Sequence, residues 1–97
     1  MAEVVAHIDH IRDRIGVDYI GIGSDFDGMS GAPTGLEDVG SYPNLFAELL
    51  RRGYSEEELR KITGLNVLRV MRKAEQVATK LRGIRPPSET LFQPEAQ

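Results

Sequence analysis

The sequence predicts an α/β fold with one short strand and about four helices. Residues 18–24 alternate apolar side chains with glycines and are followed by two carboxylates, a pattern typical of a buried strand in α/β enzymes. On both sides of this run, apolar residues recur at spacings of three and four, which indicates helices that bury one face. No second strand is evident, and a single strand cannot make a sheet. We therefore expect the C-terminal portion of a larger α/β protein, such as the last unit of a barrel.

The composition is that of an ordinary small globular domain, with 97 residues of which 40% are hydrophobic and 28% charged. The absence of cysteine excludes disulfides and thiolate metal sites. Residues 1–50 hold nine acidic and two basic side chains, whereas residues 51–97 hold six acidic and ten basic ones. Because glutamates interrupt the basic residues, the second half is interpreted as a solvated helix face, and no nucleic-acid partner is expected.

The first predicted element is a helix over residues 2–15. Its apolar side chains, spaced by three and four residues, are Val4, Val5, Ile8, Ile11 and Ile15. Gly16 then lies where the end of a helix favours glycine. The strand over residues 18–24 follows, and the glycine-rich residues 28–40 form a long loop. Long loops inside compact domains are frequently functional.

Further helices are expected after this loop. Ser41 fits a helix N-cap, Pro43 lies in the first turn, and Gly53 ends the helix. The apolar face of this helix consists of Leu45, Phe46, Leu49 and Leu50. Ser55 followed by Glu58 is a capping-box signature, which predicts the start of a second, shorter helix.

The last predicted helix covers residues 65–81. Its apolar stripe consists of Leu68, Met71, Ala74, Ala78 and Leu81. Asn66, near the start of this helix, is expected to act as a local cap or turn residue. Residues 83–97 contain three prolines and no periodicity, so an irregular tail is predicted there. Residues 1–82 would then be the terminal βα unit and the closing helices of a barrel.

The main candidate for chemistry is the run Asp25-Phe26-Asp27-Gly28 at the end of the predicted strand. Strand alternation would place Asp25 and Asp27 on one side, but a turn at Gly28 is favoured, so that only one of them faces a site. A carboxylate there could handle a proton, a substrate amine or a metal. The alternative is an Asx-type turn that caps the next segment.

Three known patterns compete for this run. A dinucleotide fingerprint fails because Phe26 occupies the place of its last glycine. A calcium loop fails because Gly28 is in fourth place from Asp25, where the motif needs glycine in sixth place. The haloacid-dehalogenase-like phosphatases place D-x-D-G after an apolar strand, with the first Asp as nucleophile and the second as proton donor. Met29 stands where that family usually has threonine. A phosphatase that uses Asp25 and Asp27 remains an alternative.

His7 and His10 form a second candidate cluster, because residues three apart share a helix face. A zinc site needs at least one further protein ligand, and Asp9 points elsewhere on the same helix. We therefore expect surface or packing histidines, and no metal ligand is assigned to this chain.

Five ordered blocks give the chain a family resemblance over roughly residues 5–72. These blocks are H-x-D-H, G-I-G-S-D-F-D-G, G-L-E-D-V, Y-P-x-L and G-x-N-x-L-R-V. The combination resembles the C-terminal part of the membrane (renal-type) dipeptidases, peptidase family M19. It is far more specific than D-x-D-G, the only support for a phosphatase.

The resemblance implies an amidohydrolase-like (β/α)8 TIM barrel that holds two zinc ions and hydrolyses dipeptides or similar small amides. In that family an Asp at the end of the last barrel strand lies beside the metals and contacts the substrate, and its position matches Asp25. The implied role of Asp25 is catalytic and substrate-binding: it holds the substrate amine or carries a proton to the leaving amine. A homodimer of the complete enzyme is also implied.

The family's metal ligands, an H-x-D near the first strand, a bridging Glu and two later His, have no match in this chain. His7 and His10 match the helix block before the last strand instead. We therefore expect this portion to bind zinc weakly and to be inactive alone. An alternative to an enzyme is that the chain is a stand-alone oligomeric interaction module. No apolar tail follows Pro94, so no lipid-anchor signal is expected, and a soluble cytoplasmic or periplasmic placement is favoured.

Overall fold

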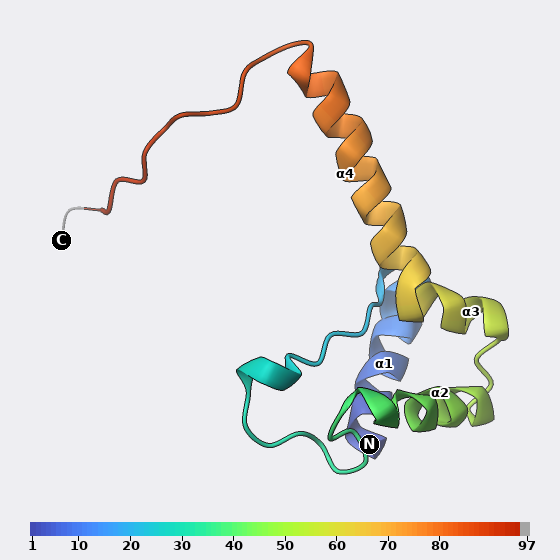
Figure 1. Ribbon diagram of the computed structural model, residues 1–97. Coiled ribbons are helices and arrows are strands. Elements are labelled where there is room, and N and C mark those ends of the chain that lie inside the picture. The colour runs from blue at the N-terminus through green and yellow to red at the C-terminus, as the bar shows by residue number, and fades with distance from the viewer. Residues whose placement is uncertain (96–97) are drawn as a thin grey trace.

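The computed structural model describes residues 1–95, which form helices, short turns and irregular segments. The α-helices are α1 (Ala2–Ile15), α2 (Tyr42–Arg51), α3 (Glu56–Arg60) and α4 (Asn66–Arg82). Between them lie the 3₁₀ turns η1 (Val17–Tyr19), η2 (Phe26–Gly28) and η3 (Val39–Ser41), and the π-helical turn η4 (Lys61–Leu65). Figure 1 shows α1, α2 and α3 gathered at one end of the molecule, while α4 projects away from them.

The strand predicted over residues 18–24 is absent from the described part of the chain. Val17–Tyr19 form a 3₁₀ turn instead, and Ile20 is extended, with φ −103° and ψ 135°. Residues 21–25 continue without regular structure, so the α/β class is not realised among residues 1–95. The physical reason is that a strand is defined by ladder hydrogen bonds to a neighbour, and these residues contain no second strand to pair with.

Helix α1 confirms the predicted helix and its end. Gly16 adopts φ 84°, and its N–H donates to the carbonyl of Arg12 over 2.8 Å. The predicted apolar stripe is only partly covered, because Ile11 and Ile15 are 37% and 56% exposed. The other end of the stripe packs into the core.

The predicted end of the second helix at Gly53 is confirmed, and its geometry is a Schellman motif. Gly53 has φ 92°, and its N–H donates to Leu50 O over 3.0 Å. The N–H of Tyr54 donates to Leu49 O over 3.1 Å. At the other end Ser41 holds the N-cap position, but its hydroxyl makes no cap hydrogen bond with the helix.

The core lies where α1 and α2 meet η4 and the residues after η1. Its buried side chains are Val5, Ile8, Ile20, Leu36, Leu45, Leu49, Tyr54 and Ile62. Leu49 is fully buried, and Leu45 and Ile62 are each 1% exposed. Ile20 therefore anchors the otherwise irregular segment 20–25 to the helices.

The chain from α3 to α4 is continuous through η4. The predicted capping box at its start is confirmed, with Ser55 and Glu58 exchanging both side-chain to backbone bonds. The apolar side chains that α4 and the end of η4 leave exposed include Leu65, Val67, Leu68, Val70, Met71 and Val77. Residues 83–95 have no helix or strand and run away from α4 in Figure 1. The last two residues of the predicted tail, Ala96 and Gln97, lie outside the described residues. Within residues 1–95, no helix is both long and apolar enough to cross a membrane.

Candidate functional site

Asp25 lies at the end of the segment 20–25, where the backbone reverses direction. Its φ of 54° and ψ of 35° place it in the left-handed region, which is uncommon for residues other than glycine and which Asp tolerates better than most. The carbonyl of Asp25 accepts the N–H of Gly28 over 2.9 Å, which closes the turn η2. The predicted turn at Gly28 is therefore confirmed, and the Asp25 side chain remains exposed.

The Asp25 side chain lies close to the backbone at Gly28. A Cβ atom at position 28 would lie 2.2 Å from Asp25 Oδ1 and 2.9 Å from its Cγ. A side chain at position 28 would therefore displace the Asp25 carboxylate from its present position. The D-x-D-G spacing thus brings the backbone at Gly28 next to the Asp25 carboxylate.

An open, mainly apolar hollow of about 330 Å³ lies beside this segment, between α1 and the start of α2. The polar side chains that line it are His7, Ser24 and Tyr42. The ring of Tyr42 also contacts Phe26, with ring centroids 5.8 Å apart. Neither Asp25 nor Asp27 lines the hollow, so the structure does not join the predicted carboxylates to it.

The two histidines do not form a metal centre with other described residues. His7 Nδ1 lies 2.7 Å from the carbonyl oxygen of Glu3 in its own helix, and His10 is exposed. Across residues 1–95, no group of three or more His, Cys, Asp or Glu side chains could hold a metal ion. The residues described here therefore do not fit a zinc site on their own.

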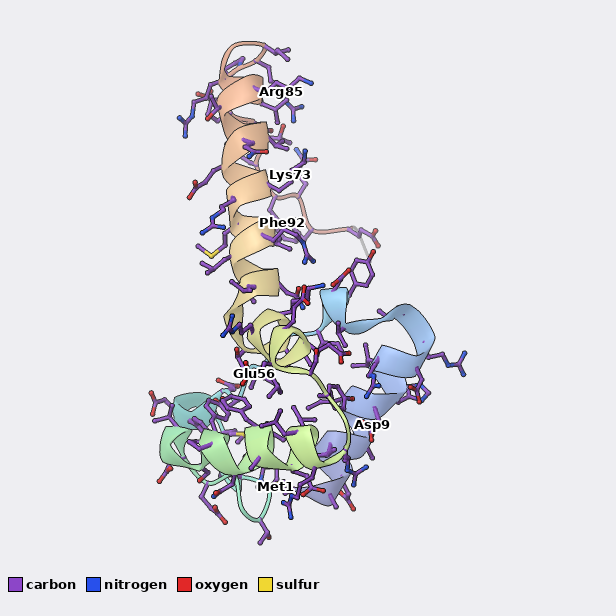
Figure 2. The ribbon with its side chains drawn as sticks, turned by 90° about the vertical axis from the view of Figure 1, so that its right-hand side faces the viewer. Met1, Asp9, Glu56, Lys73, Arg85 and Phe92 are labelled. Carbon is purple, nitrogen blue, oxygen red and sulfur yellow. The ribbon has the colours of Figure 1, made fainter. Side chains whose placement is uncertain are left out.

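Asp9 belongs to a polar cluster that sequence reasoning did not find. Asp9 Oδ1 accepts the hydroxyl of Tyr54 over 2.6 Å, and Asp9 Oδ2 accepts Arg52 Nη1 over 2.8 Å. The guanidinium of Arg12 lies over the Tyr54 ring, 4.2 Å from its centroid. The hydrogen bond from Tyr54 lowers the pKa of Asp9, and burial raises the pKa of Tyr54. Figure 2 labels Asp9 on α1, which this cluster ties to the end of α2.

Tyr54→Phe is expected to lower the free energy of unfolding by about 1–2 kcal/mol, because it removes a hydrogen bond to a charged, partly buried carboxylate. Tyr19→Phe is the matched control, since Tyr19 is 71% exposed. Urea unfolding followed by circular dichroism measures both. Equal stability of the two variants would contradict a stabilising role for the cluster.

The hydrogen bond between Tyr54 and Asp9 also predicts that the stability depends on pH. The folded-state pKa of Asp9 lies below its ordinary value of 3.8, so its contribution is fully present above that value and is lost as the pH falls through the folded-state pKa. The stability difference between the unsubstituted protein and Tyr54→Phe should therefore be full near pH 7 and shrink below about pH 4. Unfolding curves at several pH values measure this. A difference that grows on acidification would contradict it.

Asn66 has a tertiary role beyond the local cap that the sequence predicted. It is only 4% exposed and is the C-cap residue of η4, where its backbone N–H donates to Lys61 O. Its Nδ2 donates to the carbonyl oxygens of Val17 and Ile20, over 2.7 Å and 2.8 Å. From the sequence, the spacing of three residues indicates only that Asn66 and Arg69 share a helix face, and it does not identify the carbonyls of Val17 and Ile20.

The family model described as membrane dipeptidase (peptidase family M19) matches residues 1–85. The chain therefore belongs to this family of peptidases, which confirms the predicted resemblance. Residues 1–85 include both the turn that carries Asp25 and the helix that carries Asn66.

The relatives are named dipeptidases. Dipeptidase tcpJ of Claviceps purpurea is 51% identical over 86 residues, which are 89% of this chain and 20% of that protein. Dipeptidase ataJ of Aspergillus terreus is 56% identical over 79 residues, which are 81% of this chain and 19% of that protein. Dipeptidase 3 of Rattus norvegicus is 50% identical over 97 residues, which are 100% of this chain and 20% of that protein. The chain thus spans about a fifth of the length of the curated relatives it matches.

Proposed function

We propose that the gene product containing these residues hydrolyses dipeptides or similar small amides, and that this chain contributes one wall of the active site. The observation that carries the proposal is an identity of 50% or more to proteins named dipeptidases, over 81–100% of this chain. The substrate class comes from the names of those relatives.

Residues 20–24 would serve as the last strand of an amidohydrolase-like (β/α)8 barrel. The family resemblance supports this, and the extended backbone of Ile20 is compatible with it. The exposed apolar side chains of α4 would face other parts of such a barrel. Asp25 would then lie at the carboxyl end of a barrel strand, where enzymes of this fold place their active sites.

Asp25 would contact the substrate. An exposed carboxylate held at a fixed turn can pair with the ammonium group of a dipeptide through charge-assisted hydrogen bonds. The same group can carry a proton to the amine that leaves when the amide bond breaks. Asp27 and Gly28 would shape the turn that aims Asp25.

Two zinc ions are proposed for the complete enzyme on the basis of the resemblance alone. The described residues do not assemble a set of ligands for either ion. Residues 1–97 by themselves are therefore expected to bind zinc weakly and to have no peptidase activity. Isothermal titration calorimetry checks this expectation, and tight binding of two zinc ions by this chain would contradict it.

The function is tested by assaying the purified gene product against a panel of dipeptides and, in parallel, a generic aryl phosphate. We expect release of free amino acids, no phosphate release, and loss of the peptidase activity after treatment with a chelator. Turnover of the aryl phosphate that needs magnesium, without dipeptide hydrolysis, would instead favour the haloacid-dehalogenase-like reading of Asp25 and Asp27.

An alternative to an enzyme is an oligomeric interaction module that buries the apolar face of α4 against a second copy of the chain. It predicts a mass above one chain for residues 1–97 and no hydrolysis by the gene product. Light scattering separates it from the dipeptidase proposal. The homodimer of the complete enzyme is a distinct proposal, tested by the mass of the active gene product.

A further inference from the structure

The backbone turn from which the Asp25 segment starts is held by two side chains of α4. Asn66 Nδ2 bridges the carbonyl oxygens of Val17 and Ile20. Arg69 Nη1 donates to Asn66 Oδ1 over 2.8 Å, and Arg69 Nη2 donates to the carbonyl of Asp18. We call Asn66 and Arg69 the root clamp. In Figure 1 the chain after α1 passes the base of α4 before it runs out to η2.

The chemistry of the root clamp is specific to an amide. A buried carbonyl that lacks a donor is costly, and the Asn66 NH₂ group donates to the buried carbonyl of Ile20. The same NH₂ group is a second donor to the carbonyl of Val17, which also accepts the Ile20 N–H over 3.3 Å. The Arg69 guanidinium, which only donates, fixes which end of the Asn66 amide faces the backbone. An aspartate at position 66 would present oxygen to both carbonyls and would repel them.

The root clamp holds the backbone at Val17–Ile20. A small rotation of the chain there would displace Asp25 more than the same rotation closer to Asp25. Ile20 is buried and Ile22 packs partly buried against the core, whereas Gly21, Gly23 and Asp25 are exposed. The far end of the segment is held by the contact of Phe26 with Tyr42, so the root clamp is one of the contacts that set its direction. Five residues span at most roughly 16 Å when fully extended. A rotation of about 5° at Val17–Ile20 would therefore move the Asp25 backbone by up to about 1.4 Å, and a displacement of about 1 Å in an active site can lower a rate about a hundredfold.

We propose that Asn66 and Arg69 are positioning residues, which set the direction in which residues 20–25 leave the helices and thereby place Asp25. This inference rests on the proposed function as far as catalysis is concerned. Its structural part does not: it states that the root clamp, and not the packing of Ile20 alone, fixes the segment. These two residues are the N and the R of the G-x-N-x-L-R-V block.

The structural part is tested by a distance measured between spin labels. Residues 1–97 contain no cysteine, so in this chain the labels attach only at the introduced pair Ser24→Cys and Lys73→Cys, one on the segment and one on α4. Figure 2 labels Lys73 on α4. In this background Asn66→Asp is expected to broaden the distance distribution at least about twofold, whereas Asn44→Asp, an exposed amide on α2, leaves it unchanged. An unchanged width in Asn66→Asp would overturn the proposal.

Arg69→Gln tests the proposal even if Asn66→Asp, the buried variant, fails to fold. Arg69 is exposed and lies outside the core, so its substitution should leave folding intact. It is expected to shift or broaden the same distance distribution, and the matched change Arg72→Gln, one turn further along α4, is not. Identical distributions for Arg69→Gln and Arg72→Gln would overturn the part of the proposal that assigns a role to Arg69.

The catalytic part is tested by kinetics of the complete gene product. Per folded molecule, Asn66→Asp should lower kcat/KM about tenfold to a hundredfold, with Asn44→Asp unchanged. A merely structural role would lower only the folded fraction, and would leave kcat, KM and the pH profile of the folded molecules as they were; that result would overturn the proposal. If the unsubstituted gene product hydrolyses no dipeptide, the proposed function fails, while the spin-label distance still decides whether the root clamp orients the segment.

Discussion

Asp25→Asn is expected to lower kcat/KM of the complete gene product for dipeptides by about a hundredfold or more, with little change in stability. The substitution keeps the shape of the side chain but removes its charge and its capacity to accept a proton. A positioned acid or base contributes about 10²–10⁴-fold to a rate, and pairing with a substrate ammonium would add to that. Because the side chain is exposed, folding should be affected little. Steady-state kinetics with a dipeptide, together with a thermal melt, measure both quantities.

Asp13→Asn is the matched control, because Asp13 is also an exposed aspartate and lies on α1, away from the turn η2. It should leave kcat/KM unchanged. Asp27→Asn is expected to reduce activity less than Asp25→Asn, whereas a phosphatase of the D-x-D-G type would need both carboxylates. Full peptidase activity of Asp25→Asn would show that the residue matched to the family's substrate-contacting Asp is not used.

Leu49→Ala is expected to lower the free energy of unfolding by about 3–5 kcal/mol, the largest effect on stability predicted for this chain. Leu49 is fully buried, and its carbonyl accepts the Tyr54 N–H in the Schellman motif. Truncation removes apolar contacts and leaves a cavity between α1 and α2. Small domains have only about 5–15 kcal/mol of stability, so this loss should be visible as a large fall in the urea midpoint.

Leu50→Ala provides the comparison for that measurement. Leu50 is adjacent in sequence and lies in the same helix, but it is 48% exposed. Its truncation should lower the free energy of unfolding by less than about 1 kcal/mol. Similar losses in the two variants would contradict the structure, in which α2 buries Leu49 and leaves Leu50 about half exposed.

Features set by neighbouring residues were predictable from the sequence. The capping box of Ser55 and Glu58 and the glycine ends at Gly16 and Gly53 all form as expected. Each depends on contacts within one helical turn, which residue type and spacing largely decide. The turn at Gly28 belongs with these, because Asp25 and Gly28 are three residues apart.

Burial and pairing were less predictable. The apolar stripe of α1 was predicted from its spacing, but only the structure shows that Val5 and Ile8 are buried while Ile11 and Ile15 are 37% and 56% exposed. The strand expected from the Ile and Gly alternation has no partner among residues 1–95. Both outcomes depend on what other surfaces are present, and an apolar pattern specifies a face without specifying what covers it.

For the candidate site, the sequence alone determined the D-x-D-G turn with Asp25 at its start, the helices around it and the family. Only the tertiary structure decided how the segment that carries Asp25 is anchored. Asn66 reaches Val17 across 49 positions of the chain, and Tyr54 reaches Asp9 across 45. Hydrogen bonds between residues so far apart depend on the packing of whole helices, because spacing in the sequence carries no information about which distant carbonyl or carboxylate a side chain will meet.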